Sequence, residues 1–398
     1  MPSALPMTRL PRLSISLVLC SLLAWLAVAW GALALWYQVP VDMPAIRAAV
    51  SALWVVLTSL ALIRGWRKRR WGGLVLVAIA FVALLAWWST LQPSNDRDWA
   101  DDVARTTTGS VQGNIVTLSQ VRDFDWRSEN HYTPRWDARS YDLDRLRSVD
   151  MILSYWMGPA IAHTLVSFGF DDGEQLVFSV EIRKERDEAF SALGGFFKKF
   201  ETSVIAARER DIVRVRTNMR GEDDYLYRID MQPEAMRSLF LAYVDEANAL
   251  ARKPQFYNTL TANCTTIVYH MVQRIIYGLP LDYRVVLSGY LPSYVYEVGG
   301  LIDSVPLEEL TARGRITDRA RAADRDPDFS AAIRRGVPGT EPDVDADVDP
   351  AVDPAVEPPT APAVPNVDPP PAESAPPSPM PDLPAPGDEA PSPTPSIT

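Results

Sequence analysis

Three long apolar segments near the N-terminus constrain the fold of this chain more than any other feature. Residues 13–36 carry no charged side chain, residues 44–63 form a second, mostly apolar segment, and residues 71–91 form a third. A helix of about 20 residues is long enough to cross the hydrocarbon core of a bilayer. The sequence therefore predicts a three-helix transmembrane anchor over residues 1–91, embedded in the lipid bilayer.

Basic residues predict how this anchor is oriented. Arg9 and Arg12 precede the first segment, and residues 64–70, between the second and third segments, contain five Lys and Arg residues. Short loops rich in Lys and Arg remain in the cytoplasm. We therefore expect a multi-pass protein of the bacterial inner membrane, with a cytoplasmic N-terminus and with residues 92–398 in the periplasm. A signal peptide would explain only the first segment, which no clear cleavage site follows.

The C-terminal part has a composition that cannot form a core. Residues 336–398 contain 20 of the 34 prolines, 12 Asp and Glu residues, and neither Lys nor Arg. The net charge of −11 therefore comes from this part, and the rest of the chain is close to neutral. This composition is typical of disordered segments, so we expect a disordered tail over residues 326–398. Basic residues do not concentrate on any soluble segment, which argues against nucleic-acid binding.

Residues 92–325 have an ordinary globular composition and are long enough for one hydrophobic core. Short β-rich segments are expected at residues 149–156, 163–170, 175–183, 211–217 and 225–229. Two amphipathic helical patterns follow, from residue 233 to about residue 250 and from residue 264 to about residue 277. Short strands followed by packed helices indicate an α+β domain with an antiparallel sheet.

The segments 163–170 and 175–183 are expected to form a hairpin. They flank the three-residue loop 171–173, which ends in Gly, and such a loop is a common hairpin connection. The register that keeps the apolar side chains on one face pairs residues whose numbers add up to 344. His163 then lies directly opposite Glu181, and a carboxylate beside an imidazole orients the ring and makes it more basic.

Cys264 is the candidate nucleophile. The other cysteine, Cys20, lies in the first apolar segment, so Cys264 has no disulfide partner in an exported domain. Asn263 is the expected N-cap, and a helix N-terminus together with an imidazolium favours the thiolate. His163 would then be the general base, and Glu181 would orient it. From these residues alone, a structural cysteine and a structural histidine explain the pattern equally well.

Further residues would complete a catalytic site. The backbone N–H of Cys264 and the side chains of Asn258 and Asn263 would bind a substrate oxyanion, although Asn258 is as readily explained as a turn residue. Arg183 would bind an anionic head group, although pairing with a neighbouring carboxylate explains it as well. With three histidines and one usable cysteine, no metal-ligand spacing stands out, so we expect neither a metal nor another cofactor.

Seven motifs of the soluble segment occur together in one known family. They occupy residues 132–136, 141–143, 154–156, 161–170, 181–185, 214–223 and 257–266. On these motifs, the chain resembles the Lnb N-terminal periplasmic domain family, which is named after a bacterial lipoprotein intramolecular transacylase. The resemblance extends over nearly all of the soluble core.

The resemblance implies a permuted papain-like (NlpC-type) fold, in which the strand with the catalytic histidine precedes the helix with the catalytic cysteine. It implies a Cys264–His163 dyad that moves an acyl chain, through a thioester, from the glyceryl group of a lipoprotein N-terminus to its amino group. Lipoproteins or phospholipid acyl groups would then be the partners. The namesake carries its membrane helices after this domain and this chain carries them before it, so the resemblance does not fix how the site meets the membrane.

Three functions remain open from the sequence. The first is a membrane-anchored periplasmic cysteine acyltransferase or thiol hydrolase that acts on a lipid-linked acyl group through a Cys264 thioester. The second is a cysteine peptidase or amidase that acts on cell-wall peptide with the same residues. The third is a non-catalytic envelope interaction protein in which the acidic tail is the working part. The oligomeric state does not follow from any of these patterns.

Overall fold

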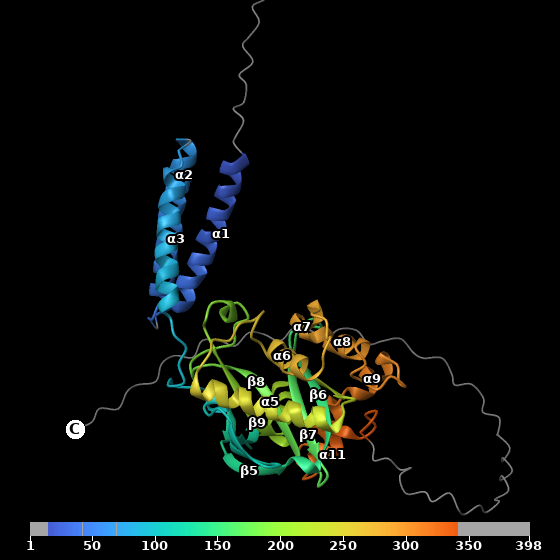
Figure 1. The fold of residues 1–398 in the computed structure, drawn as a ribbon. Coiled ribbons are helices and arrows are strands. Elements are labelled where there is room, and N and C mark those ends of the chain that lie inside the picture. The colour runs from blue at the N-terminus through green and yellow to red at the C-terminus, as the bar shows by residue number, and fades with distance from the viewer. Residues whose placement is uncertain (1–14, 42, 69, 341–398) are drawn as a thin grey trace, which may run out of the picture. The chain divides into compact units, whose positions relative to one another are not determined.

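The computed structural model describes three parts of the chain, which are residues 15–41, 43–68 and 70–340 (Figure 1). The predicted tail from residue 341 onward lies outside the described residues. Three helices near the N-terminus are long and apolar enough to cross a membrane, as the sequence predicts. They are α1 Ile15–Gln38, α2 Pro44–Arg67 and α3 Gly72–Thr90.

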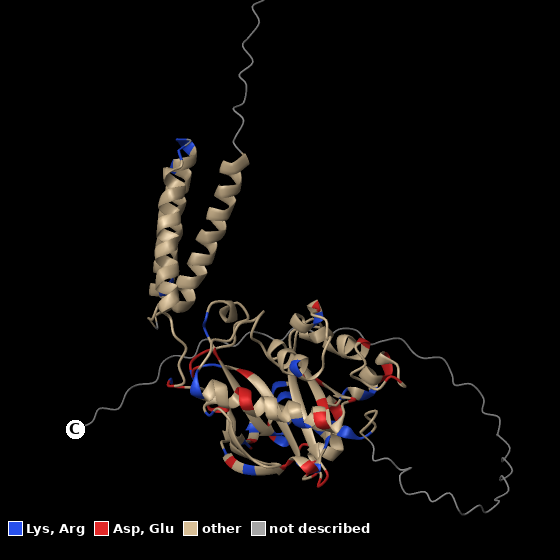
Figure 2. Ribbon diagram, in the orientation of Figure 1, with Lys and Arg blue, Asp and Glu red and all other residues tan. Residues whose placement is uncertain are grey.

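Helices α1 and α2 bury polar groups against each other. The indole N–H of Trp54 donates to the carbonyl oxygen of Val28 at 3.0 Å, and that of Trp66 donates to the hydroxyl of Ser21 at 2.8 Å. Such pairing satisfies polar groups that hydrocarbon cannot solvate. A cluster of Lys and Arg marks one end of α2, whereas most of the helical surface is uncharged (Figure 2). This distribution suits a membrane anchor with one basic end.

A mixed sheet of eight strands forms the centre of the soluble domain. Its order is β1-β2-β9-β8-β7-β6-β10, and β5 pairs with β2. Its neighbours are antiparallel except for β2 and β9, which meet in parallel. The strands are β1 Thr108–Gln112, β2 Ile115–Arg122, β5 Trp136–Asp142, β6 Leu146–Tyr155, β7 Ala162–Phe170, β8 Gln175–Arg183, β9 Glu201–Arg208 and β10 Asp223–Arg228. The predicted α+β architecture is confirmed, whereas the papain-like permutation stays a prediction.

Helices α5 Pro233–Arg252 and α6 Thr266–Ile275 cover one face of this sheet (Figure 1). Successive side chains of a strand point to opposite faces, so Phe168 of β7 and Phe178 of β8 lie on the face that α5 covers. Phe240 of α5 packs edge-on against both rings, with centroid separations of 5.1 and 5.3 Å. This aromatic cluster forms the centre of the larger hydrophobic core.

Short helices cover the opposite face, namely α4 Glu209–Arg214, the π-helix η4 Val215–Arg220, α10 Thr317–Ala322 and α11 Phe329–Arg334. The guanidinium of Arg334 lies within 2.8 Å of Asp150 in β6 and within 2.5 Å of Glu209 in α4. All three side chains are buried, and a buried charge is stable only when it is paired. The ion pairs therefore hold α11 on the sheet.

Two sequence predictions are wrong on this face. The segment 211–217, expected to be a strand, belongs to α4 and to the π-helix. The predicted domain boundary at residue 325 is too early, because Phe329, Ile333 and Val337 are buried in the core beyond it. The folded domain extends to the end of the described residues.

Further helices pack along the edge strand β10 and contribute a third, smaller core. They are α7 Tyr283–Val286, α8 Leu291–Glu297 and α9 Leu307–Gly314. The remaining elements are the 3₁₀ turns Asp101–Val103, Leu143–Arg145, Gly194–Phe196 and Ser288–Tyr290, and a separate hairpin of β3 Asp125–Ser128 and β4 His131–Thr133. These helices and the separate hairpin thus pack around the eight-stranded sheet and add no strand to it.

The aromatic cluster allows a direct test of the core. Replacing the buried Phe240 by Ala should lower the free energy of unfolding by about 3–5 kcal/mol, because it removes a large side chain and leaves a cavity. The measurement is chemical denaturation of the full chain in detergent. Tyr277→Ala is the matched control, because Tyr277 is 93% exposed, and it should change stability by less than about 0.5 kcal/mol. Equal effects of the two variants would contradict the assigned core.

Candidate active site

The β7–β8 hairpin has the register that the sequence predicts. Its pairs run from Gly169 opposite Gln175 to Leu165 opposite Ser179, so that the paired numbers add up to 344. In the connecting turn Gly173 has a φ of 82°, a conformation that favours glycine. The hairpin and its register are therefore confirmed.

Strands β7 and β8 separate beyond Leu165, where their described pairing stops. β7 stays paired with β6 as far as its first residue, Ala162, and β8 stays paired with β9 as far as its last residue, Arg183. Each strand is thus held on its outer side while the inner side opens. The opening makes room for side chains between two central strands and frees backbone N–H groups for other partners.

His163 and Glu181 lie together in this opening. His163 Nε2 is 3.1 Å from Glu181 Oε1 and 2.7 Å from Ser179 Oγ, and the Ser179 hydroxyl donates to the same Glu181 oxygen at 2.7 Å. Because this hydroxyl donates to Glu181, it accepts from Nε2–H, which leaves Nδ1 of His163 for another partner. Burial lowers the pKa of His163, but the charges of Glu181 and Cys264 outweigh burial and raise it to about 9. The imidazole is therefore protonated at neutral pH.

Cys264 reaches the imidazole from the α5–α6 side of the sheet, where it is buried. Its sulfur lies 3.8 Å from the hydroxyl of Thr265 and close enough to the His163 imidazole for the two charges to interact. Burial raises the pKa of the Cys264 thiol, but the charge of His163 outweighs burial, so that this pKa lies below its ordinary value. The arrangement favours a thiolate–imidazolium pair, the reactive form of a cysteine.

Two asparagines shape the loop that presents Cys264. Asn263 Oδ1 accepts from two successive backbone N–H groups at 2.9 and 2.8 Å, directly before α6. Asn258 Oδ1 accepts from two backbone N–H groups of its own turn, both at 3.0 Å. The helix begins two residues later than predicted, at Thr266 with Thr265 in the N-cap position, so Asn263 binds the N–H groups just before α6 instead of being its N-cap. Asn258 stabilises the turn before it.

Tyr257, which the sequence reasoning did not assign to the site, also lies beside the thiol. Its hydroxyl lies near the backbone N–H of Cys264, the group expected to bind an oxyanion. Burial, together with the charge of Cys264, raises the pKa of Tyr257, so its hydroxyl stays protonated and can donate. The only feature of the sequence that points to Tyr257 is its position as the first residue of the motif 257–266, which contains Cys264.

Arg216 links this site to a second group of buried acids. Its guanidinium lies 3.0 Å from Glu181 Oε1 and 3.1 Å from Glu222 Oε2. The hydroxyl of Ser154 contacts the carboxylates of both Glu222 and Asp224. Burial raises the pKa of Glu181, but the two cations beside it outweigh burial and hold the pKa well below its ordinary value. Burial raises the pKa of Asp224 to about 7. Arg216, which lies on the helical side of Glu181, therefore acts with His163 to keep this carboxylate ionised.

Arg183 is not brought to this site. Its guanidinium donates to the carbonyl oxygens of Val103 and Ala104 at 3.0 and 2.7 Å and to Asn95 Oδ1 at 2.9 Å. It also lies 4.5 Å from the ring of Trp99. These partners all belong to the linker that follows α3. Arg183 therefore holds the linker on the domain.

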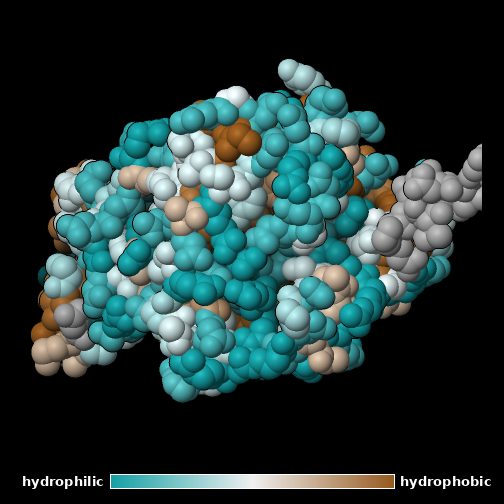
Figure 3. Space-filling view, turned by 90° about the horizontal axis from the view of Figure 1, so that it is seen from below, coloured by the Kyte–Doolittle hydropathy of each residue, from teal (hydrophilic) through white to brown (hydrophobic). Residues whose placement is uncertain are grey.

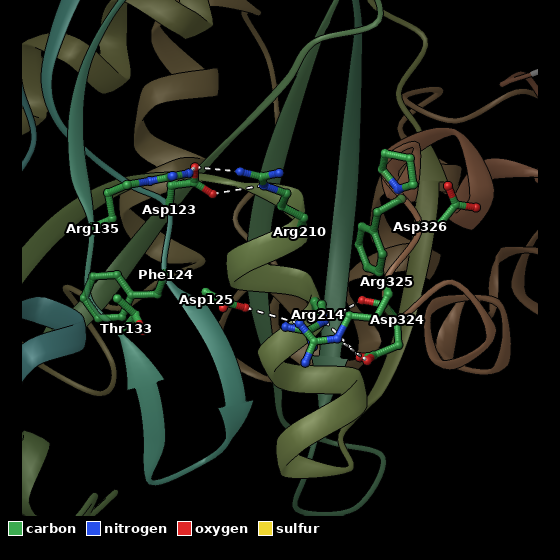
Figure 4. A pocket seen from close by; sticks show the side chains of 12 residues that line it. Asp123, Phe124, Asp125, Thr133, Arg135, Arg210, Arg214, Asp324, Arg325 and Asp326 are labelled. Atoms are coloured by element: carbon green, nitrogen blue, oxygen red, sulfur yellow. Dashed lines mark hydrogen bonds and ion pairs between the residues drawn. The ribbon is translucent and has the colours of Figure 1, made fainter.

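A charged groove elsewhere in the domain has a volume of about 460 Å³ (Figure 4). Arg210 pairs with Asp123 at 2.9 Å, and Arg214 pairs with Asp324 at 2.9 Å. The acids and bases in this groove thus face one another. Neither Cys264 nor any histidine lines it, so we do not assign the chemistry to it.

The other two histidines lie outside the buried site. His131 is exposed in β4, and His270 is exposed on α6. Among the residues that the structure describes, no group of three or more His, Cys, Asp or Glu side chains is placed to hold a metal ion. His163 is therefore the histidine that shares a buried site with a thiol.

Three apolar helices followed by an α+β domain define a membrane-associated protein with a folded extramembranous domain. Residues 132–289 of this domain match the family model described as the Lnb N-terminal periplasmic domain. The match includes His163, Glu181 and Cys264 and confirms the family resemblance predicted from the motifs. Together with the three apolar helices, it fits a membrane protein with a periplasmic domain. No curated protein and no solved structure matches the chain.

Removing the imidazole should raise the pKa of Cys264. In a Cys20→Ala background, the rate of alkylation by iodoacetamide should rise with pH through an apparent pKa below about 8.5, the ordinary thiol value, because the thiolate is the reactive form. In His163→Ala the positive charge that opposes burial is lost, so the curve should move to higher pH. Exposed His131→Ala is the control and should leave the curve unchanged. Coincident curves for His163→Ala and the parent would contradict the assigned pair.

Arg216 should matter more for stability than its neighbour in the same π-helix. Arg216→Met leaves the buried Glu181 and Glu222 without their shared cation and should cost about 3–5 kcal/mol. Arg220→Met is the control, because Arg220 is more exposed and its ion pairs are longer, at 3.4 and 4.0 Å, and it should cost less than about 1 kcal/mol. Denaturation of the full chain in detergent measures both, and equal losses would contradict this account.

Proposed function

We propose that this protein is a membrane-anchored periplasmic cysteine acyltransferase that acts on a lipid-linked acyl group through a thioester on Cys264. The observation that carries the proposal is the buried Cys264 thiol beside the His163 imidazole, whose charge lowers the pKa of the thiol, with Glu181 3.1 Å from the ring to orient it. A nucleophile, its base and a group that orients the base are the three parts of covalent acyl transfer. The match of residues 132–289 to the Lnb N-terminal periplasmic domain family supports an acyl substrate.

The first half of the reaction forms the thioester. The Cys264 thiolate attacks the carbonyl carbon of an ester, and the negative charge moves to the carbonyl oxygen. The backbone N–H of Cys264 and the hydroxyl of Tyr257 are the donors proposed for this oxyanion, and the amide of Asn258 is a further candidate. The carbon–oxygen bond to the alcohol then breaks, and the leaving alkoxide takes the proton from the His163 imidazolium.

The second half releases the acyl group. An acceptor amine attacks the thioester carbonyl, the neutral imidazole of His163 takes the amine proton, and the carbon–sulfur bond breaks to regenerate the thiolate. Attack by water in place of the amine would make the same site a thiol hydrolase. Glu181 stays ionised throughout and stabilises the imidazolium each time it forms.

The membrane anchor supports a lipid-linked substrate. Three helices place the domain on a bilayer surface, and we propose the inner membrane with a cytoplasmic N-terminus, because the basic end of α2 would remain in the cytoplasm. The substrate proposed from the family is the N-terminus of a lipoprotein, whose acyl chain would move from the glyceryl group to the amino group. We also propose that the domain has a permuted papain-like fold, in which strand β7 with the histidine precedes helix α6 beside the cysteine.

A trapping experiment tests the thioester. The full chain in detergent is incubated with a synthetic diacylated lipopeptide, once with a free N-terminal amine and once with that amine acetylated. We expect the acetylated form to leave an acyl adduct on the Cys264 peptide, removable by hydroxylamine, because no acceptor is present. The free form should instead become an amide-linked product of unchanged mass. Mass spectrometry measures both.

Cys264→Ala and His163→Ala should give neither adduct nor product, whereas Cys20→Ala should behave as the wild type does. Release of fragments from cell-wall peptide, without an acyl adduct, would assign the site to a peptidase or amidase instead. A normally folded Cys264→Ala variant that retains the cellular phenotype would favour a non-catalytic interaction protein. Either result would overturn the acyltransferase proposal.

A further inference from the structure

Large apolar side chains are exposed around the loop that carries Cys264. They belong to three separate segments: residues 156–157 after β6, residues 190–196 between β8 and β9, and residue 260 before α6. We call this set the apolar lip, and it consists of Trp156, Met157, Phe190, Leu193, Phe196 and Leu260. Single exposed apolar residues are common, but a cluster of this size marks an interaction site.

Direct contacts join the three segments into one surface. Thr259 donates to the carbonyl oxygen of Ala192 at 2.9 Å, so the segment with Leu193 lies against the loop before Cys264. The rings of Trp156 and Phe190 meet edge to face, with centroids 6.1 Å apart. The lip therefore extends from the end of β6 to the loop that presents the thiol.

The lip also lies close to the membrane, because the linker after α3 is short. The last residue of α3 is Thr90, and the backbone N–H of Ser94 already donates to Glu201 in β9 at 3.0 Å. Four residues span at most about 14 Å. The backbones of Glu201 and Phe256 pair in an isolated β-bridge, and Phe256 directly precedes the loop that carries Cys264. The linker thus holds this side of the domain within reach of the bilayer surface.

Two contacts bind the residues directly after the lip segment 190–196 to the ends of the membrane helices. Lys198 Nζ donates to the carbonyl oxygen of Trp88 in α3 at 3.0 Å. Phe197 stacks on Tyr37 at the end of α1, with ring centroids 5.7 Å apart. Leu193 and Phe196 are therefore close in sequence to residues that contact the ends of the helices long and apolar enough to cross a membrane.

The face of the domain seen from below has a different character. It is mainly hydrophilic, with apolar residues scattered among polar ones (Figure 3). Apolar side chains at a bilayer surface gain free energy by leaving water. An aromatic and aliphatic cluster on the anchored side, opposite a polar face, has the asymmetry of a surface that rests in a membrane.

We infer that the apolar lip inserts into the periplasmic leaflet of the membrane that the helices span. The occupant of this surface is the bilayer itself. The inserted lip lets a lipid-linked acyl chain move from the leaflet to Cys264 without crossing water, and this last step rests on the proposed function. Insertion itself does not depend on catalysis.

A depth measurement tests insertion independently of activity. Leu193→Cys is introduced into a Cys20→Ala, Cys264→Ala background, labelled with the environment-sensitive fluorophore NBD, and reconstituted in vesicles of phosphatidylethanolamine and phosphatidylglycerol. We expect a blue-shifted emission that nitroxides on the lipid acyl chains quench and aqueous iodide does not. Val111→Cys is the matched control, since Val111 is exposed in β1, and its label should show the reverse pattern.

Three outcomes would overturn the inference. Iodide could quench the two labels equally, or the label at residue 193 could be unaffected by lipid nitroxides. Protection that develops only when a lipoprotein is added would assign the lip to a protein partner instead. Because this background lacks Cys264, none of these results bears on acyl transfer, so the two proposals fail separately.

An activity measurement then tests the link to the substrate. Leu193→Ser combined with Phe196→Ser should lower transfer from a bilayer-embedded donor roughly tenfold or more, because two inserted side chains are lost. Turnover of a short-chain, water-soluble ester and alkylation of Cys264 should be unchanged. Equal losses on both donors would mean that the substitutions damage the site itself, and an unchanged bilayer rate would overturn the role of the lip.

Discussion

The buried charges of His163, Glu181 and Arg216 depend on one another, and the surrounding structure is arranged to keep them paired. A buried charge that loses its partner costs several kcal/mol, so none of these side chains is stable there alone. The β7–β8 hairpin supplies the imidazole and the carboxylate in one register, and the π-helix on the opposite face supplies the guanidinium. The thiol of Cys264 then enters a site with a positive charge already in place. That charge explains why its pKa is lowered although it is buried.

Much of this arrangement can be predicted from the sequence, because simple periodicities define it. The alternation of apolar residues along β7 and β8 permits one register, and that register places His163 beside Glu181. The three- and four-residue spacing of apolar side chains predicts α5 and α6, and segment length alone predicts the membrane helices. The pairing of Cys264 with His163 required more, namely the absence of a disulfide partner and the motifs shared with the family.

The remaining features depend on long-range contacts that no local pattern encodes. The alternating apolar and basic residues around Arg214 and Arg216 predict a strand, but the segment is helical. Both guanidinium groups are buried in ion pairs with carboxylates far away in the sequence, Asp324 and Glu181. Arg183 binds linker carbonyl groups about 80 residues earlier in the chain instead of a neighbouring acid. The segment after residue 325 is rich in polar residues, but Phe329 and Ile333 fit a core that the rest of the chain forms.

The most direct test of the central claim is the protonation state of His163, which nitrogen-15 NMR of the labelled full chain in nanodiscs can measure. If Cys264 and His163 form a thiolate–imidazolium pair, both ring nitrogens carry a proton at pH 7, because the pKa of His163 is about 9. Replacing Cys264 by Ala should then lower that pKa, because one of the two negative partners is lost. A neutral imidazole at pH 7, with a pKa that does not respond to Cys264→Ala, would contradict the account.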